Sequence, residues 1–495
     1  MKIKKLFKDL SIKEIKGSKE LEISGICSNS NYAFPGCLYI AKKGLTHDGS
    51  QFIPRAVAAG ALAVVCDIYD PFLENIVQII CENPSEIESE IARRYFEDPS
   101  KELFTIGITG TNGKTTTSYL IKHIFDQLDN QCGLIGTIET IVGKMKMFSS
   151  HTTPDCIANQ KLLREMIREN CKAAVMEVSS HGLVQKRVKN ISYDVAIFTN
   201  FTAEHLDYHK SMQNYLDAKK MLFQNLEPST TAILNIDCQV FDELKKVCRS
   251  NIFTYAVHKK ADVTAKNIIF SSSGSSFDLC YKDQKVKIHL SLLGDFNIYN
   301  ALAAAACALV KGFSLKQIQK ALSSHISIPG RVEKLNVKTP FDVYIDYAHT
   351  EDALEKTLQN LQKIKRNKVI CVFGCGGDRD KQKRPKMAKV CEKYSDLCVI
   401  TADNPRSEDP EVICQEICEG FEKKSHIVEI DRYLAIKKAI SLAQEKDIIL
   451  IAGKGHETKQ IFSHQTIDFD DRKIAKEICS QILKNSYNGM QARRG

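Results

Sequence analysis

Apolar residues in the middle of the chain gather in short runs, and longer amphipathic stretches separate one run from the next. The runs with this pattern are Phe104–Ile108, Ala173–Val178, Val195–Asn200 and Thr231–Asn235. Short apolar runs predict buried strands, and the stretches between them predict helices. Strands that alternate with helices form βαβ units, so the pattern predicts a mainly parallel sheet.

The same alternation resumes after Pro329-Gly330, a turn dipeptide that interrupts it. The later runs are Val343–Tyr347, Val369–Gly374, Leu397–Thr401 and Ile448–Gly453, and the runs before Pro99 include Cys37–Ala41 and Leu62–Cys66. A chain of 495 residues is too long for one ordinary core. We therefore expect an α/β protein of three domains, 1–99, 100–328 and 329–495, with two domains as the alternative.

Composition narrows the class of protein. Apolar residues make up 43% and charged residues 26%, which is the balance of a soluble globular chain. The net charge of +9 is spread along the chain, so it fits an anionic substrate but is too diffuse to argue for nucleic acid. The longest apolar run, Ala301–Val310, is far too short to span a membrane and predicts a buried helix.

Two further features bear on where the protein works. The 18 cysteines include no pair with the spacing of a metal site, and unpaired thiols in a chain of this size indicate a reducing cytosol. The start, Met1–Leu10, is basic but lacks the apolar core of a signal peptide. We therefore expect a cytoplasmic protein.

The strongest local motif is Gly110-Thr111-Asn112-Gly113-Lys114-Thr115-Thr116, which follows a strand and precedes a helix. Glycines let backbone N–H groups approach phosphates, Lys114 would neutralise the β- and γ-phosphates, and Thr115 could hold Mg²⁺. The spacing departs from the common phosphate loop, because Ile108 stands where a glycine is usual. A Gly-rich turn with an incidental lysine is the alternative, but the strand and the helix in this order favour a phosphate loop.

The second motif is Met176-Glu177-Val178-Ser179-Ser180-His181, at the end of an apolar strand. A carboxylate at Glu177 could reach a Mg²⁺ held at the phosphate loop. The alternative is structural, with Ser179 and Ser180 capping a helix. The motif alone does not decide between the two.

The third group combines Glu204-His205-Leu206-Asp207-Tyr208-His209 with Ala218-Lys219 further along the chain. Two histidines around an acidic run indicate a second cation site, although imidazole is not a usual Mg²⁺ ligand. A single histidine is more often a polar side chain without a catalytic role. A helical lysine such as Lys219 is normally exposed to solvent.

Together these motifs resemble the Mur ligases, the ATP-dependent enzymes that add amino acids to peptidoglycan precursors. The resemblance covers nearly the whole chain and rests on Thr109–Thr116, Met176–Leu183, His205–Lys219, Leu293–Asn300, Pro329–Glu333 and Asp346–Thr350. It implies a small N-terminal α/β domain that binds UDP, a central phosphate-loop ATPase with a mainly parallel sheet, and a C-terminal Rossmann-like domain that binds the incoming amino acid.

The resemblance also implies roles for individual residues. Thr115 and Glu177 would hold one Mg²⁺, and His205 and a carbamylated Lys219 (N6-carboxylysine) would hold or support a second. The expected catalytic residues are Lys114, Lys219, His205 and Glu177. The positions that match ATP contacts are Gly110 to Thr116, Asn297, Arg331, Asp346 and His349. The positions that match contacts to the UDP-muramyl peptide are Ser30, Thr152, Thr153, Ser179, Gln185 and Arg187.

Three more motifs resemble the members of the family that add meso-diaminopimelate as the third residue. They are Gly374–Asp380 followed by Lys383-Arg384-Pro385, then Asp403-Asn404-Pro405-Arg406, then Gly453–Glu457. The residues expected to bind diaminopimelate are Arg379, Asp403, Asn404, Pro405, Arg406, Gly453 and Glu457. Arg406 is expected to pair with the distal carboxylate, the group that lysine lacks.

The sequence departs from the family pattern at three places. Cys27–Asn31 reads Cys-Ser-Asn-Ser-Asn where Asp-Ser-Arg is usual, His151 stands in place of asparagine, and Glu351 in place of proline. None of these changes removes an expected catalytic group.

The resemblance implies an acyl-phosphate mechanism. ATP would phosphorylate the D-glutamyl carboxylate of UDP-N-acetylmuramoyl-L-alanyl-D-glutamate, and the amino group of meso-diaminopimelate would attack the product. ATP is the expected co-substrate and Mg²⁺ the expected cofactor. We expect a monomer that binds neither nucleic acid nor membrane.

Several other functions remain open from the sequence. The nearest are a lysine-adding Mur ligase and a ligase like folylpolyglutamate synthetase, although the motifs at 374–380 and 403–406 disfavour the second. A nucleic-acid-stimulated ATPase is disfavoured because no basic stripe with interleaved aromatics is present. A dinucleotide-binding module at the C-terminus is disfavoured because Gly374-Cys375-Gly376-Gly377 lacks the full glycine pattern.

Overall fold

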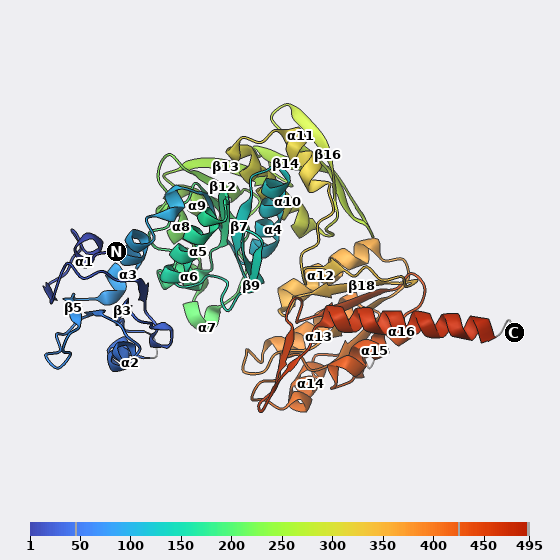
Figure 1. Cartoon of the computed structure of the whole chain (residues 1–495). Helices are drawn as coiled ribbons and strands as arrows, with labels where there is room; N and C mark the ends of the chain where they lie inside the picture. Colours follow the sequence, from blue (N-terminus) through green and yellow to red (C-terminus); the bar gives the residue numbers. More distant parts are fainter. Residues whose placement is uncertain (45–46, 424–425, 493–495) are drawn as a thin grey trace. The chain divides into compact units, whose positions relative to one another are not determined.

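The computed structural model describes residues 1–44, 47–423 and 426–492. Contacts within the chain divide it into two compact units (Figure 1). The first comprises Met1–Thr264 and Leu302–Ser314, and the second comprises Ala265–Ala301 and the chain from Leu315 onward. Strand β14 (Val263–Ser271) and helix α10 (Asp295–Lys311) run from one unit into the other.

The first unit begins with a five-stranded sheet in the order β1-β5-β4-β3-β2. The strands are β1 (Glu14–Lys16), β2 (Gly25–Cys27), β3 (Cys37–Ile40), β4 (Ala63–Cys66) and β5 (Val77–Ile80). All neighbours are parallel except β1 and β5. The helices here are α1 (Ile3–Leu6), α2 (Ile53–Ala58) and α3 (Pro84–Tyr95). Asn83 caps α3, and Pro84 occupies its first turn, where a missing N–H is tolerated.

A larger sheet follows, and its parallel part has the order β14-β13-β12-β11-β6-β10-β7. Besides β14, these strands are β6 (Phe104–Thr109), β7 (Cys132–Ile135), β10 (Ala173–Glu177), β11 (Val195–Phe198), β12 (Thr231–Asn235) and β13 (Asn251–Ala256). Beyond β7 the antiparallel strands β8 (Glu139–Val142) and β9 (Met145–Phe148) complete one edge. The expected mainly parallel sheet is confirmed, and the strands end within one or two residues of their predicted positions.

Helices lie on both faces of this sheet (Figure 1). They are α4 (Lys114–Gln127), α5 (Cys156–Arg168), α6 (Ser180–Val184), α7 (Leu206–His209), α8 (Met212–Gln224) and α9 (Phe241–Val247). Strand β6 lies between β10 and β11, so the loop after it meets the carboxyl ends of both neighbours. Ligands gather at such an edge in open α/β sheets.

The second unit contains the antiparallel hairpin β15 (Gly274–Tyr281) and β16 (Gln284–Leu290), followed by α11 (Leu315–Leu322). In α10, residues Ala301–Ala308 are completely buried. The buried helix predicted from Ala301–Val310 is therefore confirmed, and it begins earlier than the apolar run.

The rest of the second unit is a Rossmann-like layer around a six-stranded sheet in the order β17-β18-β22-β19-β20-β21. The strands are β17 (Glu333–Lys334), β18 (Asp342–Asp346), β19 (Val369–Phe373), β20 (Leu397–Ile400), β21 (His426–Val428) and β22 (Ile448–Ala452), with a separate hairpin of β23 (Lys459–Ile461) and β24 (Thr466–Asp468). All neighbours in the six-stranded sheet are parallel except β17 and β18. The helices are α12 (Glu351–Ile364), α13 (Lys383–Tyr394), α14 (Pro410–Cys418), α15 (Arg432–Leu442) and α16 (Asp471–Ala492).

Two of the sequence expectations concern the chain as a whole. All 18 cysteines are free thiols, and most of them are buried, as expected from their single spacing. Across the described ranges, none of the helices combines the length and the apolar character needed to cross a membrane.

Candidate active site

The phosphate loop runs from the end of β6 to the start of α4, as predicted. Gly110 has a φ of 145° and Gly113 a φ of 87°, which L-residues with side chains rarely adopt. A Cβ on Gly110 would lie 1.9 Å from Thr199 Oγ1. Glycine at position 110 is therefore required by both the backbone conformation and the close approach of Thr199.

Side chains at the end of β11 hold this loop in place. Thr199 Oγ1 donates to the Asn112 carbonyl at 2.6 Å, and the Asn112 N–H donates to Asn200 Oδ1 at 2.8 Å. Lys114 Nζ lies 2.9 Å from the Gly110 carbonyl and 2.8 Å from the Thr111 carbonyl. A cation over a glycine-rich turn at the start of a long helix is a suitable site for phosphate groups.

Glu177 lies at the end of β10, beside the phosphate loop, and is completely buried. Its Oε2 accepts hydrogen bonds from Thr115 Oγ1 at 3.0 Å and from Thr137 Oγ1 at 2.8 Å, and its Oε1 accepts from the Thr137 N–H at 2.9 Å. The structural alternative is correct for Ser179, which caps α6 by accepting a hydrogen bond from the Gly182 N–H. It is wrong for Ser180, which is the first residue of α6 and whose hydroxyl lies 2.9 Å from His209 Nε2. Capping by Ser179 leaves the Glu177 carboxylate directed at Thr115.

Lys219 lies on α8 and is only 1% exposed, so the expectation of an ordinary surface lysine is wrong. The helix packs this face inward, and Lys219 Nζ donates to the Gly110 carbonyl at 2.8 Å and lies 4.3 Å from the centre of the Tyr215 ring. Burial, and then the charge of Lys114, lower the pKa of Lys219 well below its ordinary value. A neutral amine next to the phosphate loop is able to react with CO₂, which an ammonium group is not.

His205 precedes α7 in a left-handed conformation, with a φ of 56°. Its ring centre lies 4.9 Å from that of His181, which also contacts Tyr208 at 4.2 Å and His209 at 5.5 Å. Burial, and then the neighbouring histidines, lower the pKa of His181 to about 4, and burial lowers the pKa of His205. The imidazoles in this cluster are therefore neutral at physiological pH.

Within the ranges that the structure describes, no three side chains of His, Cys, Asp or Glu are arranged to hold a metal ion. The oxygens that a hard cation prefers are nevertheless present at one point, where the Thr115 hydroxyl meets the Glu177 carboxylate.

Five of the six residues expected to contact the UDP-muramyl peptide form one hydrogen-bonded group beside Glu177. Thr153 Oγ1 donates to the Glu177 carbonyl at 2.8 Å and to Ser179 Oγ at 3.0 Å. Arg187 donates to the Thr153 carbonyl at 2.8 Å and, through two nitrogens, to Gln185 Oε1 at 3.0 and 2.7 Å. The fifth, Thr152, lies 3.1 Å from Thr137, hydroxyl to hydroxyl.

The sixth, Ser30, begins a short 3-10 helix that follows β2 of the N-terminal sheet. Its unusual neighbour Asn29 shapes this turn, because the Asn29 side chain accepts a hydrogen bond from the Asn31 N–H at 3.0 Å. The departure from Asp-Ser-Arg therefore keeps a turn-capping side chain at position 29.

The remaining residues expected to approach the nucleotide belong to the second unit. Asp346, at the end of β18, accepts hydrogen bonds from the Val332 and Ala348 N–H groups at 2.8 and 3.0 Å and from Thr357 Oγ1 at 3.1 Å, and burial raises its pKa. The Arg331 guanidinium and the His349 ring each lie 4.7 Å from the Tyr347 ring. Asn297 lies on α10, where its amide donates to the Leu293 carbonyl at 2.8 Å.

The residues expected to bind diaminopimelate converge at the ends of β19, β20 and β22. Asn404 Nδ2 donates to Glu457 Oε2 at 2.7 Å, and Arg406 Nη1 donates to the Gly377 carbonyl at 2.8 Å. A Cβ on Gly376 would lie 2.9 Å from Arg406 Nη1 and 3.8 Å from Arg379 Cγ, so this glycine separates the two arginines.

Two other members of this set, Asp403 and Gly453, meet just after the end of β22. Gly453 has a φ of 114°, and a Cβ there would lie 2.4 Å from Asp403 Oδ2. The Pro405 carbonyl occupies the space next to Gly377 in the same way, 1.8 Å from where a Cβ would stand. Glycines at these positions allow the three strand ends to approach one another.

The two acidic residues that follow Arg406 closely in sequence, Glu408 and Asp409, do not pair with it. Glu408 pairs with Arg384 at 3.0 Å, which helps lower its pKa to about 2, and Asp409 caps α14. In the described part of the chain no carboxylate lies within ion-pair distance of Arg406. Its guanidinium is half-buried and donates to backbone carbonyls, so it is available to a carboxylate ligand.

Sequence reasoning missed two polar residues of these sites. Thr137 follows β7, and β7 lies beside β10, the strand that ends at Glu177. A polar residue just after a neighbouring parallel strand was the signal that could have identified it. Lys454 stands inside the Gly453–Glu457 motif and is completely buried, with Nζ 3.1 Å from Asn404 Oδ1 and 3.5 Å from Glu457 Oε2. Burial lowers the pKa of Lys454, whereas burial and then Asp403 raise the pKa of Glu457.

Three family models match the chain in order. They are "Mur ligase family, catalytic domain" at residues 22–96, "Mur ligase middle domain" at residues 108–308, and "Mur ligase, glutamate ligase domain" at residues 330–455. Each model falls on one of the three large sheets described above, although the first begins after β1 and the second begins within β6.

Curated relatives match over nearly their whole length. A UDP-N-acetylmuramoyl-L-alanyl-D-glutamate–2,6-diaminopimelate ligase of Chlamydia felis is 46% identical, with 94% of this chain and 96% of the relative covered. A protein of the same name from Chlamydia trachomatis serovar D is 42% identical over 97% of this chain and 100% of the relative. A "ligase 1" of that name from Clostridium acetobutylicum is 40% identical over 98% and 100%.

Solved structures agree with this. A structure titled as a UDP-N-acetylmuramoyl-L-alanyl-D-glutamate–2,6-diaminopimelate ligase superimposes with a TM-score of 0.71 and 30% identity, covering 98% of this chain and 99% of that one. MurF from Acinetobacter baumannii has a TM-score of 0.67 at 20% identity, over 92% and 94%, and shares the fold. From the ordered family models and from relatives that are 40–46% identical along nearly the whole sequence, we conclude that the chain belongs to the Mur ligase family.

Proposed function

We propose that this protein is the ATP-dependent ligase that adds meso-diaminopimelate to UDP-N-acetylmuramoyl-L-alanyl-D-glutamate in peptidoglycan precursor synthesis. Members of the family form amide bonds at the expense of ATP, and the relatives above carry this activity in their names. The observation that carries the proposal is the cluster of Asn404, Arg406 and Glu457 at the ends of the C-terminal strands. Arg406 pairs with no carboxylate among the described residues and lies beside the half-buried carboxylate of Glu457, an arrangement that suits an amino acid with an extra acidic group.

We assign three functional regions along the chain. Residues 1–99 would bind the UDP part of the substrate, with Ser30 as a contact. Residues 100–328 would bind ATP and the peptide part, and residues 329–495 would bind the incoming amino acid. Asn297, Arg331, Asp346 and His349 would approach the nucleotide.

The oxygens near the phosphate loop fit a magnesium ion. Thr115 and Glu177 would hold one Mg²⁺, because both are hard oxygen donors and their oxygens lie 3.0 Å apart. His205 and Lys219, the latter as a carbamate, would hold or support a second. When bound, the ions offset the negative charge of the phosphates.

The chain's own residues would promote the first step, in which a carboxylate oxygen of the D-glutamyl side chain attacks the γ-phosphorus of ATP and ADP leaves. Lys114 and the loop N–H groups stabilise the negative charge that spreads over the transferred phosphoryl group. Thr153, Gln185 and Arg187 would hold the acceptor peptide next to this point, where they already form one network. Holding both reactants in line supplies much of the rate enhancement.

In the second step the amino group of diaminopimelate attacks the acyl phosphate. The tetrahedral intermediate then loses inorganic phosphate and a proton, which leaves the amide. Glu457 and Asn404 would orient the amino acid, and Arg406 would pair with its distal carboxylate in a two-bond fork. A site built for this carboxylate disfavours lysine, because lysine leaves Arg406 unpaired.

A phosphate-release assay tests the proposal. ATP is incubated with UDP-N-acetylmuramoyl-L-alanyl-D-glutamate and either diaminopimelate or lysine, and in parallel with a folate and glutamate, or with DNA or RNA. We expect release only with the muramyl dipeptide and diaminopimelate together. Equal release with lysine would support the lysine-adding alternative, and vigorous release without either acceptor or amino acid would refute ligase activity.

The location and partners follow from the same proposal. Its substrates, ATP and a UDP-linked precursor, place the reaction in the cytoplasm, and the free thiols are compatible with a reducing compartment. We propose a monomer that uses no nucleic acid and no membrane.

A further inference from the structure

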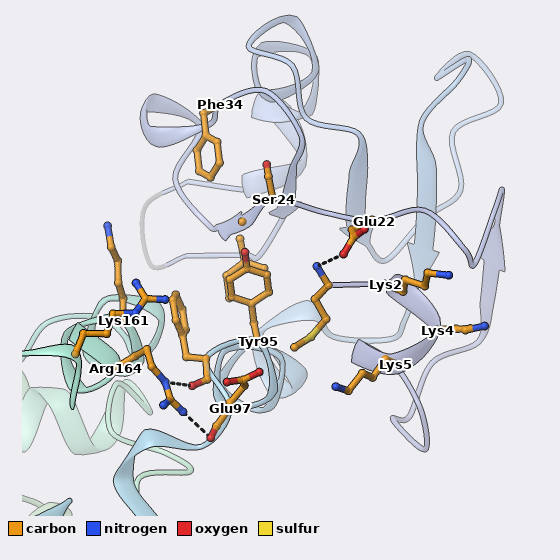
Figure 2. A pocket seen from close by; sticks show the side chains of 15 residues that line it. Lys2, Lys4, Lys5, Glu22, Ser24, Phe34, Tyr95, Glu97, Lys161 and Arg164 are labelled. Atoms are coloured by element: carbon orange, nitrogen blue, oxygen red, sulfur yellow. Dashed lines mark hydrogen bonds and ion pairs between the residues drawn. The ribbon is translucent and has the colours of Figure 1, made fainter. Parts of the chain in front are cut away.

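A cavity of about 810 Å³ lies in the first unit, between the N-terminal sheet and helix α5 (Figure 2). Its walls come from α1, the start of β2, the end of α3 and the exposed side of α5. The volume is in the range of pockets that hold small organic ligands.

The cavity is separate from the sites described above. Ser24 and Gly25 line it at the amino end of β2, whereas Ser30 follows the carboxyl end of the same strand. None of the residues assigned here to ATP, to the muramyl peptide or to diaminopimelate lines it.

One part of the cavity wall is aromatic. Phe34 is 41% exposed, and it lies across Gly25, where an added Cβ would stand 2.2 Å from Phe34 Cζ. Tyr95 and Phe96, at the end of α3, pack edge to face with ring centres 5.1 Å apart. Figure 2 shows Phe34 and Tyr95 among the side chains that line the cavity. Exposed rings around a hollow favour a planar apolar group.

The rim of the cavity is cationic. Six Lys and Arg side chains line it, against two glutamates. Lys2 and Lys4 pair with Glu20, so their charge is compensated. Lys161 is exposed, and its Nζ lies 3.8 Å from Glu165 Oε1 one turn along α5. Lys5 and Arg168 are exposed, and across the described residues neither has an ion pair or a side-chain hydrogen bond. Arg168 lies close enough to Tyr95 to interact with it electrostatically. Burial raises the pKa of Tyr95, and the positive charge of Arg168 lowers it.

Arg164 fixes the shape of the rim. Its guanidinium donates to the Phe96 and Glu97 carbonyls at 2.8 and 2.9 Å and pairs with Glu102 at 2.8 Å (Figure 2 shows the two carbonyl contacts). These bonds tie α5 to the end of α3, so the aromatic wall and the cations of α5 are held opposite each other before any ligand arrives.

We propose that this cavity is a second ligand site, which binds an anion of about nucleotide size that carries a planar ring and a phosphate group. The ring would pack on Phe34 and Tyr95, and the phosphate would lie against Lys161 and Arg168 of α5. Cations alone would accept any anion, and aromatic side chains alone would accept any apolar ring. The combination selects a ligand that has both.

Titration calorimetry of the full-length protein with guanosine 5′-monophosphate tests the proposal. This probe has a ring and a phosphate, and its base occurs in neither ATP nor the UDP-linked substrate. We expect binding to guanosine 5′-monophosphate at least 10-fold tighter than to ribose 5-phosphate, which lacks the ring, or to guanosine, which lacks the phosphate. Equal affinity for ribose 5-phosphate would overturn the proposal, because the aromatic wall would then have no role.

A pair of matched double variants locates the binding. Lys161→Glu with Arg168→Glu reverses two cations of the rim and should weaken the binding of guanosine 5′-monophosphate at least 10-fold. Lys8→Glu with Arg249→Glu makes the same change of charge at exposed positions outside the cavity and should leave it unchanged. Both variants should keep ligase turnover, which verifies that they fold. Unchanged affinity in the rim variant, as expected if the probe binds only at the phosphate loop, would refute the site.

Discussion

Replacing Lys219 with methionine separates a structural lysine from a functional one. Methionine keeps an unbranched side chain of similar length and removes the amine, so packing on Tyr215 and within α8 is conserved. The amine is buried, and burial holds its pKa well below the ordinary value, so the folded protein disfavours its charged form. The variant therefore removes a group that is costly to bury.

The effect on stability should be small. Loss of the hydrogen bond from Lys219 Nζ to the Gly110 carbonyl costs about 1 kcal/mol, and that carbonyl still accepts from Lys114. Relief from burying an amine returns about 1–3 kcal/mol. We expect a thermal midpoint that is unchanged or slightly higher. The effect on turnover should be large, since loss of one electrostatic group at the transition state costs about 10²–10³-fold.

The assay is phosphate release with both substrates, with thermal unfolding measured on the same samples. Lys220→Met is the matched control, because Lys220 is the next residue of α8 and pairs with Glu243 at 2.6 Å. It should keep turnover. Lys219→Ala, which leaves a gap, should regain part of its activity with an added short-chain carboxylic acid. A folded Lys219→Met protein with wild-type turnover would refute the carbamate hypothesis.

Three further predictions concern other residues. Arg406→Ala should lower kcat/KM for diaminopimelate, because about 2–5 kcal/mol of transition-state binding is lost, and should leave the KM for ATP unchanged. If the variant prefers diaminopimelate over lysine as strongly as the wild type in a competition assay, the selection argument is contradicted. Thr137→Val removes a hydroxyl that donates to Glu177, so the Mg²⁺ concentration for half-maximal turnover should rise about 10–100-fold, and an unchanged Mg²⁺ titration would exclude this role. Burial, and then nearby arginines, lower the pKa of His456 from 6.5 to about 3. Between these two pH values the folded state binds fewer protons than the unfolded state, so stability is lost as the pH falls from 6.5 toward 3. His456→Gln should reduce the loss of thermal stability between pH 7 and pH 5, and equal losses in both proteins would show that another group is responsible.

The local pattern of apolar and polar residues was sufficient to predict the strands and helices and the order of the motifs along the chain. The runs at Phe104–Ile108 and Thr231–Asn235 are buried strands, because parallel strands covered on both faces need continuous apolar sequence. The phosphate loop was predictable for a similar reason, since Gly110 and Gly113 meet requirements of the backbone that hold wherever such a turn occurs. The roles of the site residues stay predictions until the variants are measured.

Burial and partners could not be read from the sequence. Lys219 looks like any helical lysine, and its inward position depends on how α8 packs on the central sheet. Thr137 reaches Glu177 because β7 lies beside β10, and Glu408 pairs with Arg384 instead of Arg406 because α13 brings that arginine to the same turn.

The sequence by itself determined which segments become strands and helices, where the glycine-rich turns lie, and which family the motifs resemble. These properties depend on neighbours along the chain. Only the tertiary structure decided which lysine is buried, which arginine is left for a ligand, and that Phe34, Lys161 and Arg168 share one cavity. Those outcomes depend on packing between segments that are distant in sequence, and a local pattern contains no information about distances of that kind.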